Sequence, residues 1–183
     1  MANQQLMTTQ EYLNTPESLL PTELIYGKLR VADSPLVPHQ RVVMDLSLAL
    51  FEHVQRRRLG EVLMSPMDVI FDVDKALVVQ PDLLFVSNER SHIVTDRIYG
   101  APDLVVEVLS PNPRIGELRE RLDWFAQYGV KECWLVHQLQ RWVEVLNFDG
   151  GKVVARTSFH ERAPVRSRVL PDFDRTLSSM LRW

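Results

Sequence analysis

Apolar residues recur at two periods along this chain, and the change of period separates the expected helices from the expected strands. After His39, apolar residues are spaced three and four positions apart as far as Val54. This spacing predicts an amphipathic helix of about 20 residues, and Gly60 is expected to stop it. Helical spacing returns over residues 118–126 and ends at Gly129, which predicts a second main helix.

Other segments show the alternation or the short apolar runs that are typical of β-strands. Residues 104–109 are apolar except for Glu107, which predicts a central buried strand. Asp149-Gly150-Gly151 predicts a hairpin turn, and two short strands are expected around Tyr26-Gly27. Further strands are expected over residues 69–73, 77–80, 83–86, 132–136, 142–148 and 152–158.

Short helices are expected at both ends of the chain. Thr8 and Glu11 form a capping box that predicts a helix start, and a last short helix is expected over residues 176–181. Strands around two main helices predict a mixed α/β fold. The 183 residues suit a single domain over residues 1–183, with an N-terminal arm over 1–20 and a C-terminal tail over 160–183.

Composition narrows the classes of protein that fit this pattern. Apolar residues make up 45% and charged residues 25% of the chain, which excludes general disorder. The single cysteine, Cys133, excludes an intramolecular disulfide and a multi-cysteine metal site. No apolar stretch approaches the roughly 20 residues of a membrane helix, and residues 1–10 lack the pattern of a signal peptide, so we expect a cytoplasmic protein without a membrane partner. The net charge of −3 means that nucleic-acid binding needs a local basic patch.

Two acidic residues stand out because their neighbours are apolar. Glu107 lies within the run 104–109, and Asp82 follows Pro81 at the start of another apolar run. A carboxylate removed from water is costly unless it is paired, hydrogen-bonded or bound to a metal. Two acids from neighbouring strands can converge on one divalent cation whose other ligands are waters and substrate phosphates, which describes magnesium.

The same residues also allow a structural interpretation. Glu107 could form a buried ion pair with Arg121 or Arg119, and Asp82 could cap a turn after the proline. The spacing of the residues does not decide between an ion pair and a metal site.

Pro81-Asp82 is followed along the chain by Glu107-Val108-Leu109-Ser110, by an expected helix and by the segment 129–136. Glu23-Leu24-Ile25 with Gly27 precedes them, and His39 opens the long helix. This combined pattern, which covers most of the chain, resembles the bacterial putative restriction endonuclease family of the PD-(D/E)XK nuclease superfamily.

The resemblance implies a restriction endonuclease-like core, a central mixed sheet flanked by helices, with an additional C-terminal hairpin. It implies a metal-dependent endonuclease that hydrolyses DNA phosphodiester bonds, with no organic cofactor. Asp82 and Glu107 are the implied ligands of Mg²⁺ or Mn²⁺, and His39 is an implied site residue. Glu23 is either a third acid near the metal or a solvated strand residue, and we favour the solvated position.

The chain departs from the family pattern at positions that bear on catalysis. The superfamily has a lysine where this chain has Leu109, and the family lysine of the following helix aligns with Arg121. Arginine stays protonated and cannot act as a base, although it can hold a phosphate. Tyr26 stands where an aspartate before the glycine is usual, and His137 where an acid is usual. An alternative function is therefore a catalytically silent DNA-binding or protein-interaction module.

Surface cations and tryptophans carry further expectations. Residues 56–58, three arginines, suit a solvated helix end better than a DNA contact. Arg114, Arg119 and Arg121 could form a local basic rim beside the metal. A homodimer is expected, because the hairpin over residues 141–158 offers edges that need cover. Three tryptophans are expected in the core or in a dimer interface, namely Trp124, Trp134 and Trp142.

Overall fold

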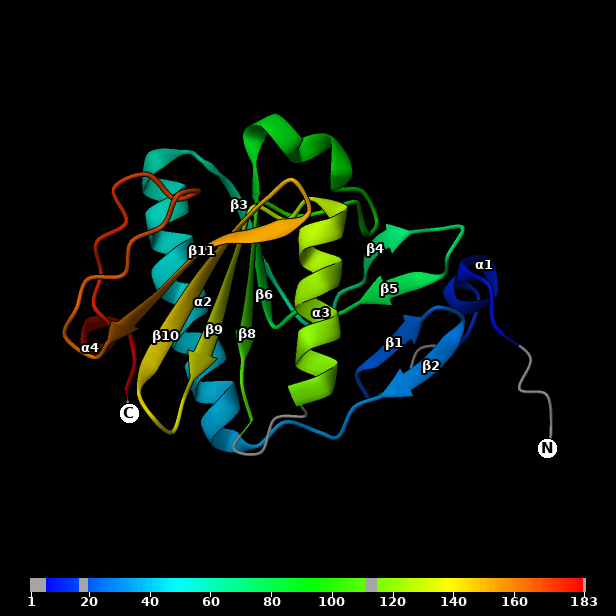
Figure 1. Ribbon diagram of the computed structural model, residues 1–183, viewed down its shortest axis with the longest axis horizontal. Coiled ribbons are helices and arrows are strands. Elements are labelled where there is room, and N and C mark those ends of the chain that lie inside the picture. The colour runs from blue at the N-terminus through cyan, green and yellow to red at the C-terminus, as the bar shows by residue number, and fades with distance from the viewer. Residues whose placement is uncertain (1–5, 17–19, 111–114, 183) are drawn as a thin grey trace.

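The computed structural model describes residues 6–16, 20–110 and 115–182, and it contains two mixed sheets and few helices (Figure 1). The mixed α/β class expected from the sequence is confirmed at this level. The helices are α1 (Thr9–Leu13), α2 (Val37–Arg57), the 3₁₀ helix η1 (Asn88–Ile93), α3 (Ile115–Tyr128) and α4 (Leu177–Met180). No helix among the described residues is both long and apolar enough to cross a membrane.

The larger sheet has six strands in the order β11-β10-β9-β8-β6-β3. Only β8 and β9 run parallel, and the other neighbours are antiparallel. The apolar run around Glu107 forms β8, between β9 and β6, so the expected central strand is confirmed. The strands are β3 (Gly60–Met64), β6 (Leu83–Ser87), β8 (Leu104–Val108), β9 (Glu132–His137), β10 (Trp142–Asp149) and β11 (Lys152–His160).

The smaller sheet has five short strands in the order β2-β1-β5-β4-β7. Its β1–β2 hairpin turns through two residues, Tyr26 and Gly27, because Ile25 pairs directly with Lys28. The strands are β1 (Thr22–Ile25), β2 (Lys28–Val31), β4 (Val69–Asp72), β5 (Leu77–Val79) and β7 (Ile98–Tyr99).

The helices cover the faces of the larger sheet, as Figure 1 shows. On one face α2 packs with α4 and the C-terminal segment around Phe173, and Trp134 lies fully buried among them. On the other face α3 packs through Trp124 and Phe125, which also contact the smaller sheet. Helix α1 covers the remaining face of the smaller sheet through Tyr12. Helix α3 therefore lies between the two sheets.

The ends of α2 differ from the sequence prediction in detail. The helix starts at Val37, two residues before His39, because Pro38 suits the first turn of a helix. It stops at Arg58, which adopts a left-handed conformation with φ of 54°. Gly60 is not the helix stop but the first residue of β3, where an added Cβ would lie 2.0 Å from the carbonyl oxygen of Val86.

Candidate functional site

Asp82 directly precedes β6 and lies beside Glu107 of the neighbouring antiparallel strand β8. Leu83 at the start of β6 pairs with Val106 of β8, and the next step of this register places Asp82 opposite Glu107. Directly opposed residues point to the same face, with Cβ atoms about 4.5–5.5 Å apart. The backbone N–H of Val108 donates to Oδ2 of Asp82 at 2.7 Å, which ties the aspartate to β8.

Arg121 of α3 joins the two sheets through a pair of carboxylates. Its Nε donates to Oε1 of Glu107 at 2.6 Å, and its Nη1 donates to Oε1 of Glu23 at 2.7 Å. Glu23 belongs to β1 of the smaller sheet, and its Oε1 also accepts from the backbone N–H of Gln80 at 2.7 Å. The expected pairing of Glu107 with an arginine is therefore present, and its partner is Arg121, whereas Arg119 is exposed.

His39 reaches the site from the first turn of α2. Its Nε2 lies 3.3 Å from Oδ2 of Asp82, and its buried Nδ1 has no hydrogen-bond partner among the described residues. Burial lowers the pKa of His39, but the hydrogen bond and charge of Asp82 outweigh it, so the pKa lies above its ordinary value. His39 therefore favours the protonated state beside the aspartate.

Glu107 is mostly buried but open enough to meet a small ligand. Its side chain is 13% exposed, and that of Asp82 is 21% exposed. Burial raises the pKa of Glu107 to about 7; Arg121 opposes this rise and the nearby Asp82 charge adds to it. The two carboxylates thus repel each other in a place where water screens them poorly.

The chemistry of these donors fits a divalent cation. Three carboxyl groups, those of Glu23, Asp82 and Glu107, lie beside one permanent cation, Arg121, so a second cation would relieve the repulsion that raises the pKa of Glu107. Within the described residues, Oε2 of Glu107 and Oδ1 of Asp82 accept no hydrogen bond from another residue. The same part of the chain contains no group of three or more His, Cys, Asp or Glu side chains arranged for a metal. A hydrated cation that takes one or two carboxylates, as Mg²⁺ does, suits this donor set.

The sequence prediction for Glu23 is wrong. The sequence favours a solvated strand residue, but the Glu23 side chain is only 13% exposed and binds Arg121 together with Glu107. The polar and apolar residues around Glu23 are as typical of an exposed edge strand as of a strand that lines a site. Its partners are Gln80 and Arg121, 57 and 98 positions away along the chain, so local sequence did not reveal them.

The remaining candidates lie outside this cluster. Arg57 donates to Asp172 at 2.8 Å, and residues 56–58 are exposed, as expected for a solvated helix end. Arg114 lies outside the described residues. Trp124 and Trp134 are buried in the core as predicted, and the half-buried Trp142 stacks on His137 with ring centroids 3.7 Å apart.

Comparisons with known proteins agree with the fold just described. The family model described as Uma2, Putative restriction endonuclease, matches residues 9–178. The crystal structure of a putative nuclease belonging to DUF820 from Anabaena variabilis shares the fold with a TM-score of 0.77 at 17% sequence identity. That match covers 95% of this chain and 97% of the other. No curated protein matches the sequence. The match over residues 9–178 shows that this chain belongs to the Uma2 family, described as putative restriction endonucleases.

Proposed function

We propose that this protein is a metal-dependent endonuclease that hydrolyses DNA phosphodiester bonds, with Asp82 and Glu107 as the ligands of Mg²⁺ or Mn²⁺. The observation that carries the proposal is the register that places Asp82, just before β6, opposite Glu107 of β8, with Asp82 tied to β8 through the backbone N–H of Val108. Family membership and the central mixed sheet flanked by α2 and α3 support it.

Each side chain of the site would have a separate role in phosphodiester hydrolysis. Asp82 and Glu107 would hold the cation, which when bound lowers the pKa of a coordinated water and neutralises charge on the phosphate. Arg121 stays protonated and presents a planar group of donors that can bind a phosphate oxygen. His39, whose pKa is raised, can donate a proton or a hydrogen bond beside Asp82.

Arg121 also supports a second candidate function. Its guanidinium already binds Glu107 and Glu23, and arginine cannot take a proton from water at neutral pH. A nuclease fold with this arginine could bind DNA without cleaving it, as a silent DNA-binding or protein-interaction module. The substitution Arg121→Lys separates the two functions, because lysine restores a compact amine that can titrate when buried.

Cleavage of a supercoiled plasmid in Mg²⁺ tests the proposal. We expect Asp82→Asn and Glu107→Gln to lower the rate at least about 100-fold, because each removes a charged ligand. Asp123→Asn, an exposed acid on α3, is the matched control and should cleave like the wild type. Equal residual cleavage by all three variants would indicate a contaminating nuclease and contradict the proposal.

The arginine substitution needs its own control. Arg119→Lys changes an exposed arginine of the same helix and should leave the cleavage rate unchanged. If the wild type is inactive and only Arg121→Lys cleaves DNA, the silent module is the correct function of the native chain. Calorimetric titration with Mn²⁺ shows independently whether Asp82 and Glu107 bind a cation.

We also propose that the protein forms a homodimer through the hairpin of β10 and β11. Strand β11 is the last strand of the larger sheet, and its Val153 and Val154 are 42% and 53% exposed. Unpaired strand edges favour association unless they are covered. Light scattering should give twice the chain mass of 21.2 kDa for the wild type and a single chain mass for Val154→Lys. A monomeric wild type would remove the proposal.

A further inference from the structure

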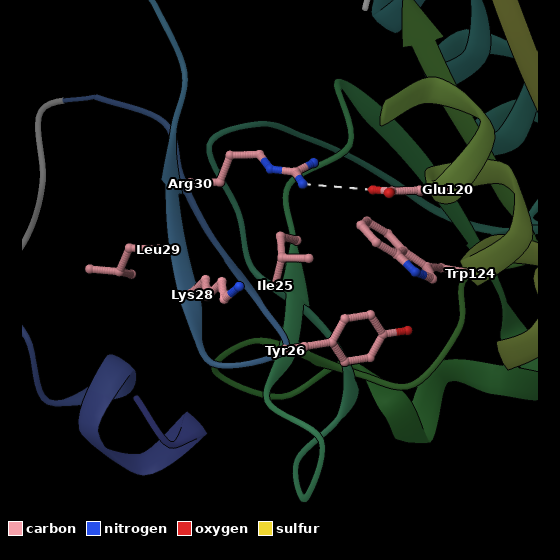
Figure 2. A pocket seen from close by; sticks show the side chains of 7 residues that line it. All are labelled: Ile25, Tyr26, Lys28, Leu29, Arg30, Glu120 and Trp124. Atoms are coloured by element: carbon pink, nitrogen blue, oxygen red, sulfur yellow. Dashed lines mark ion pairs between the residues drawn. The ribbon is translucent and has the colours of Figure 1, made fainter. Parts of the chain in front are cut away.

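A pocket opens between the β1–β2 hairpin and α3, as Figure 2 shows. Its volume of about 500 Å³ lies within the range of small-ligand pockets. Tyr26 and Trp124 meet edge to face in its wall, with ring centroids 5.9 Å apart and an interplanar angle of 83°. On the opposite side from Tyr26, Arg30 forms a 3.7 Å ion pair with Glu120. The remaining lining residues are Ile25, Lys28 and Leu29.

The backbone at Tyr26 is unusual for an aromatic residue. Tyr26 and Gly27 both have positive φ, at 49° and 81°, as a two-residue type I′ hairpin turn requires. Asn or Asp normally takes the first of these positions, because a bulky side chain is strained there. The chain nevertheless places a tyrosine at the turn, with 42% of it exposed. Strain of this kind clusters at sites of function, and here it sets an aromatic ring at the mouth of the pocket.

The pocket and the acidic site are neighbours along β1 and α3. Ile25 lies two positions from Glu23 on β1, so both side chains point to the same face, toward α3. On α3, Glu120 directly precedes Arg121, whose guanidinium binds Glu23. A DNA strand that crosses the acidic site can therefore extend into this pocket.

The lining selects the chemistry of the occupant. A partly exposed aromatic ring next to a buried one offers a stacking surface, which suits the flat face of a nucleobase. Lys28 is exposed, and the acid that pairs with Arg30 is 58% exposed, so both cations can turn to a phosphate. A base inside a regular duplex is stacked between its neighbours and cannot enter such a pocket.

We propose that this pocket binds an unpaired nucleobase of the DNA strand whose phosphate lies at the acidic site, so that the substrate is single-stranded or locally unpaired DNA. This inference rests on the proposed function, because it assumes that DNA is the ligand. The exposed ring of Tyr26 stacks on the base and is held in place by its edge-to-face contact with Trp124, while Lys28 and Arg30 contact the adjoining phosphates.

Binding measured without cleavage tests the inference. A fluorescent single strand of twelve thymidines is titrated with the protein in EDTA, beside a strand of equal length built from abasic sites. We expect the wild type to bind the base-bearing strand roughly tenfold more tightly, which is the effect of stacking one base. Tyr26→Asn should abolish this difference and melt no lower than the wild type, because asparagine tolerates positive φ. Lys28→Ala should weaken the binding of both strands by a similar factor.

Tyr99→Leu is the matched control, since Tyr99 is an exposed tyrosine on β7, outside the pocket. It should keep the preference for the base-bearing strand. A wild type without that preference, a Tyr26→Asn variant that retains it, or equal competition by a blunt duplex would each overturn the inference. If the wild type cleaves no DNA but still prefers the base-bearing strand, the proposed function is wrong and the inference about the pocket stands.

Discussion

The two ends of the central strands carry buried acids in two different settings. At one end, Asp82 just before β6 lies opposite Glu107 of β8, and of these two acids Arg121 binds only Glu107. At the other end, Asp103 directly precedes β8 and Glu132 begins β9. These two acids are 1% and 0% exposed, so they are more deeply buried than the acids of the candidate site.

Glu132 is surrounded by donors. Trp134 Nε1 donates to its Oε1 at 2.7 Å, while Asn147 Nδ2 and the backbone N–H of Arg168 donate to its Oε2 at 2.8 and 2.7 Å. These bonds join β9, β10 and the C-terminal segment. A carboxylate with three donors is compensated for the loss of water, so Glu132 acts as a structural anchor.

Asp103 is compensated in a different way. It accepts from the backbone N–H of Ser87 at 2.8 Å and lies 2.6 Å from Nζ of Lys131. Burial raises the pKa of Asp103, but Lys131 and Ser87 outweigh burial and bring the pKa below its ordinary value. Burial of an acid is therefore not a sign of function by itself. The distinguishing feature of the candidate site is a second carboxylate opposite the first.

Removal of the anchor should have the largest effect on stability. Glu132→Ala leaves three buried donors without an acceptor, and we expect the free energy of unfolding to fall by about 3–5 kcal/mol. Urea denaturation followed by tryptophan fluorescence measures this change. Glu89→Ala, which removes an exposed glutamate, is the control and should change stability by less than about 0.5 kcal/mol. A loss below about 1 kcal/mol for Glu132→Ala would contradict the anchor role.

A divalent cation should stabilise only one of the two ends. At a Mg²⁺ concentration 100-fold above its dissociation constant, the folded state gains about 2.7 kcal/mol, which raises the melting temperature. We expect this gain in the wild type and in Asp103→Asn, and no gain in Glu107→Gln. Thermal melts with Mg²⁺ and with EDTA measure it. A response that survives in Glu107→Gln would place the cation elsewhere.

The ion pair at the candidate site should contribute little to net stability. Adding Glu107→Gln to Arg121→Met removes both charges of the Glu107–Arg121 pair and leaves Glu23 with the backbone N–H of Gln80, so the double variant should be more stable than Arg121→Met alone. Arg121→Met alone should destabilise by about 3 kcal/mol, because Glu107 and Glu23 lose their shared cation. If the double variant is as unstable as the single one, the pair is a structural element rather than a site.

The two ends should respond to pH with opposite signs. Because the pKa of Glu107 is raised from 4.5 to about 7, its stabilising contribution is complete below pH 4.5 and is lost as the pH rises through 7. The pKa of Asp103 is lowered, so its contribution is present above pH 3.8 and is lost as the pH falls. Urea midpoints in EDTA measure both trends. Glu107→Gln should remove the loss of stability at high pH, and Asp103→Asn should remove the loss at low pH. If each variant removes the other trend, the contrast between the two ends is wrong.

Most elements of the fold were predictable from local pattern. The alternating and helical periods placed β8, α2 and α3, because side-chain periodicity follows directly from backbone geometry. The end of α2 was misplaced, since Arg58 takes the left-handed position that a glycine usually fills. The spacing did not show that Gly60 is required by the close approach of the Val86 carbonyl.

The candidate site was predictable only in part. Asp82 and Glu107 stood out because apolar runs surround them, whereas Glu132, which is fully buried, begins its strand and gave no comparable signal. Glu23 was misread because its partner Arg121 comes from another element.

The amino-acid sequence by itself determined most of the strands and helices, and it singled out the two acids beside or within apolar runs, since both depend on residues close together along the chain. Only the tertiary structure decided which buried acids receive enough hydrogen bonds and which share the guanidinium of Arg121. Glu23 meets Arg121 across 98 positions, and Glu132 meets Asn147 and the backbone of Arg168 across 15 and 36 positions. The electrostatic state of a carboxylate depends on the donors and charges around it, and packing brings those together from distant parts of the chain.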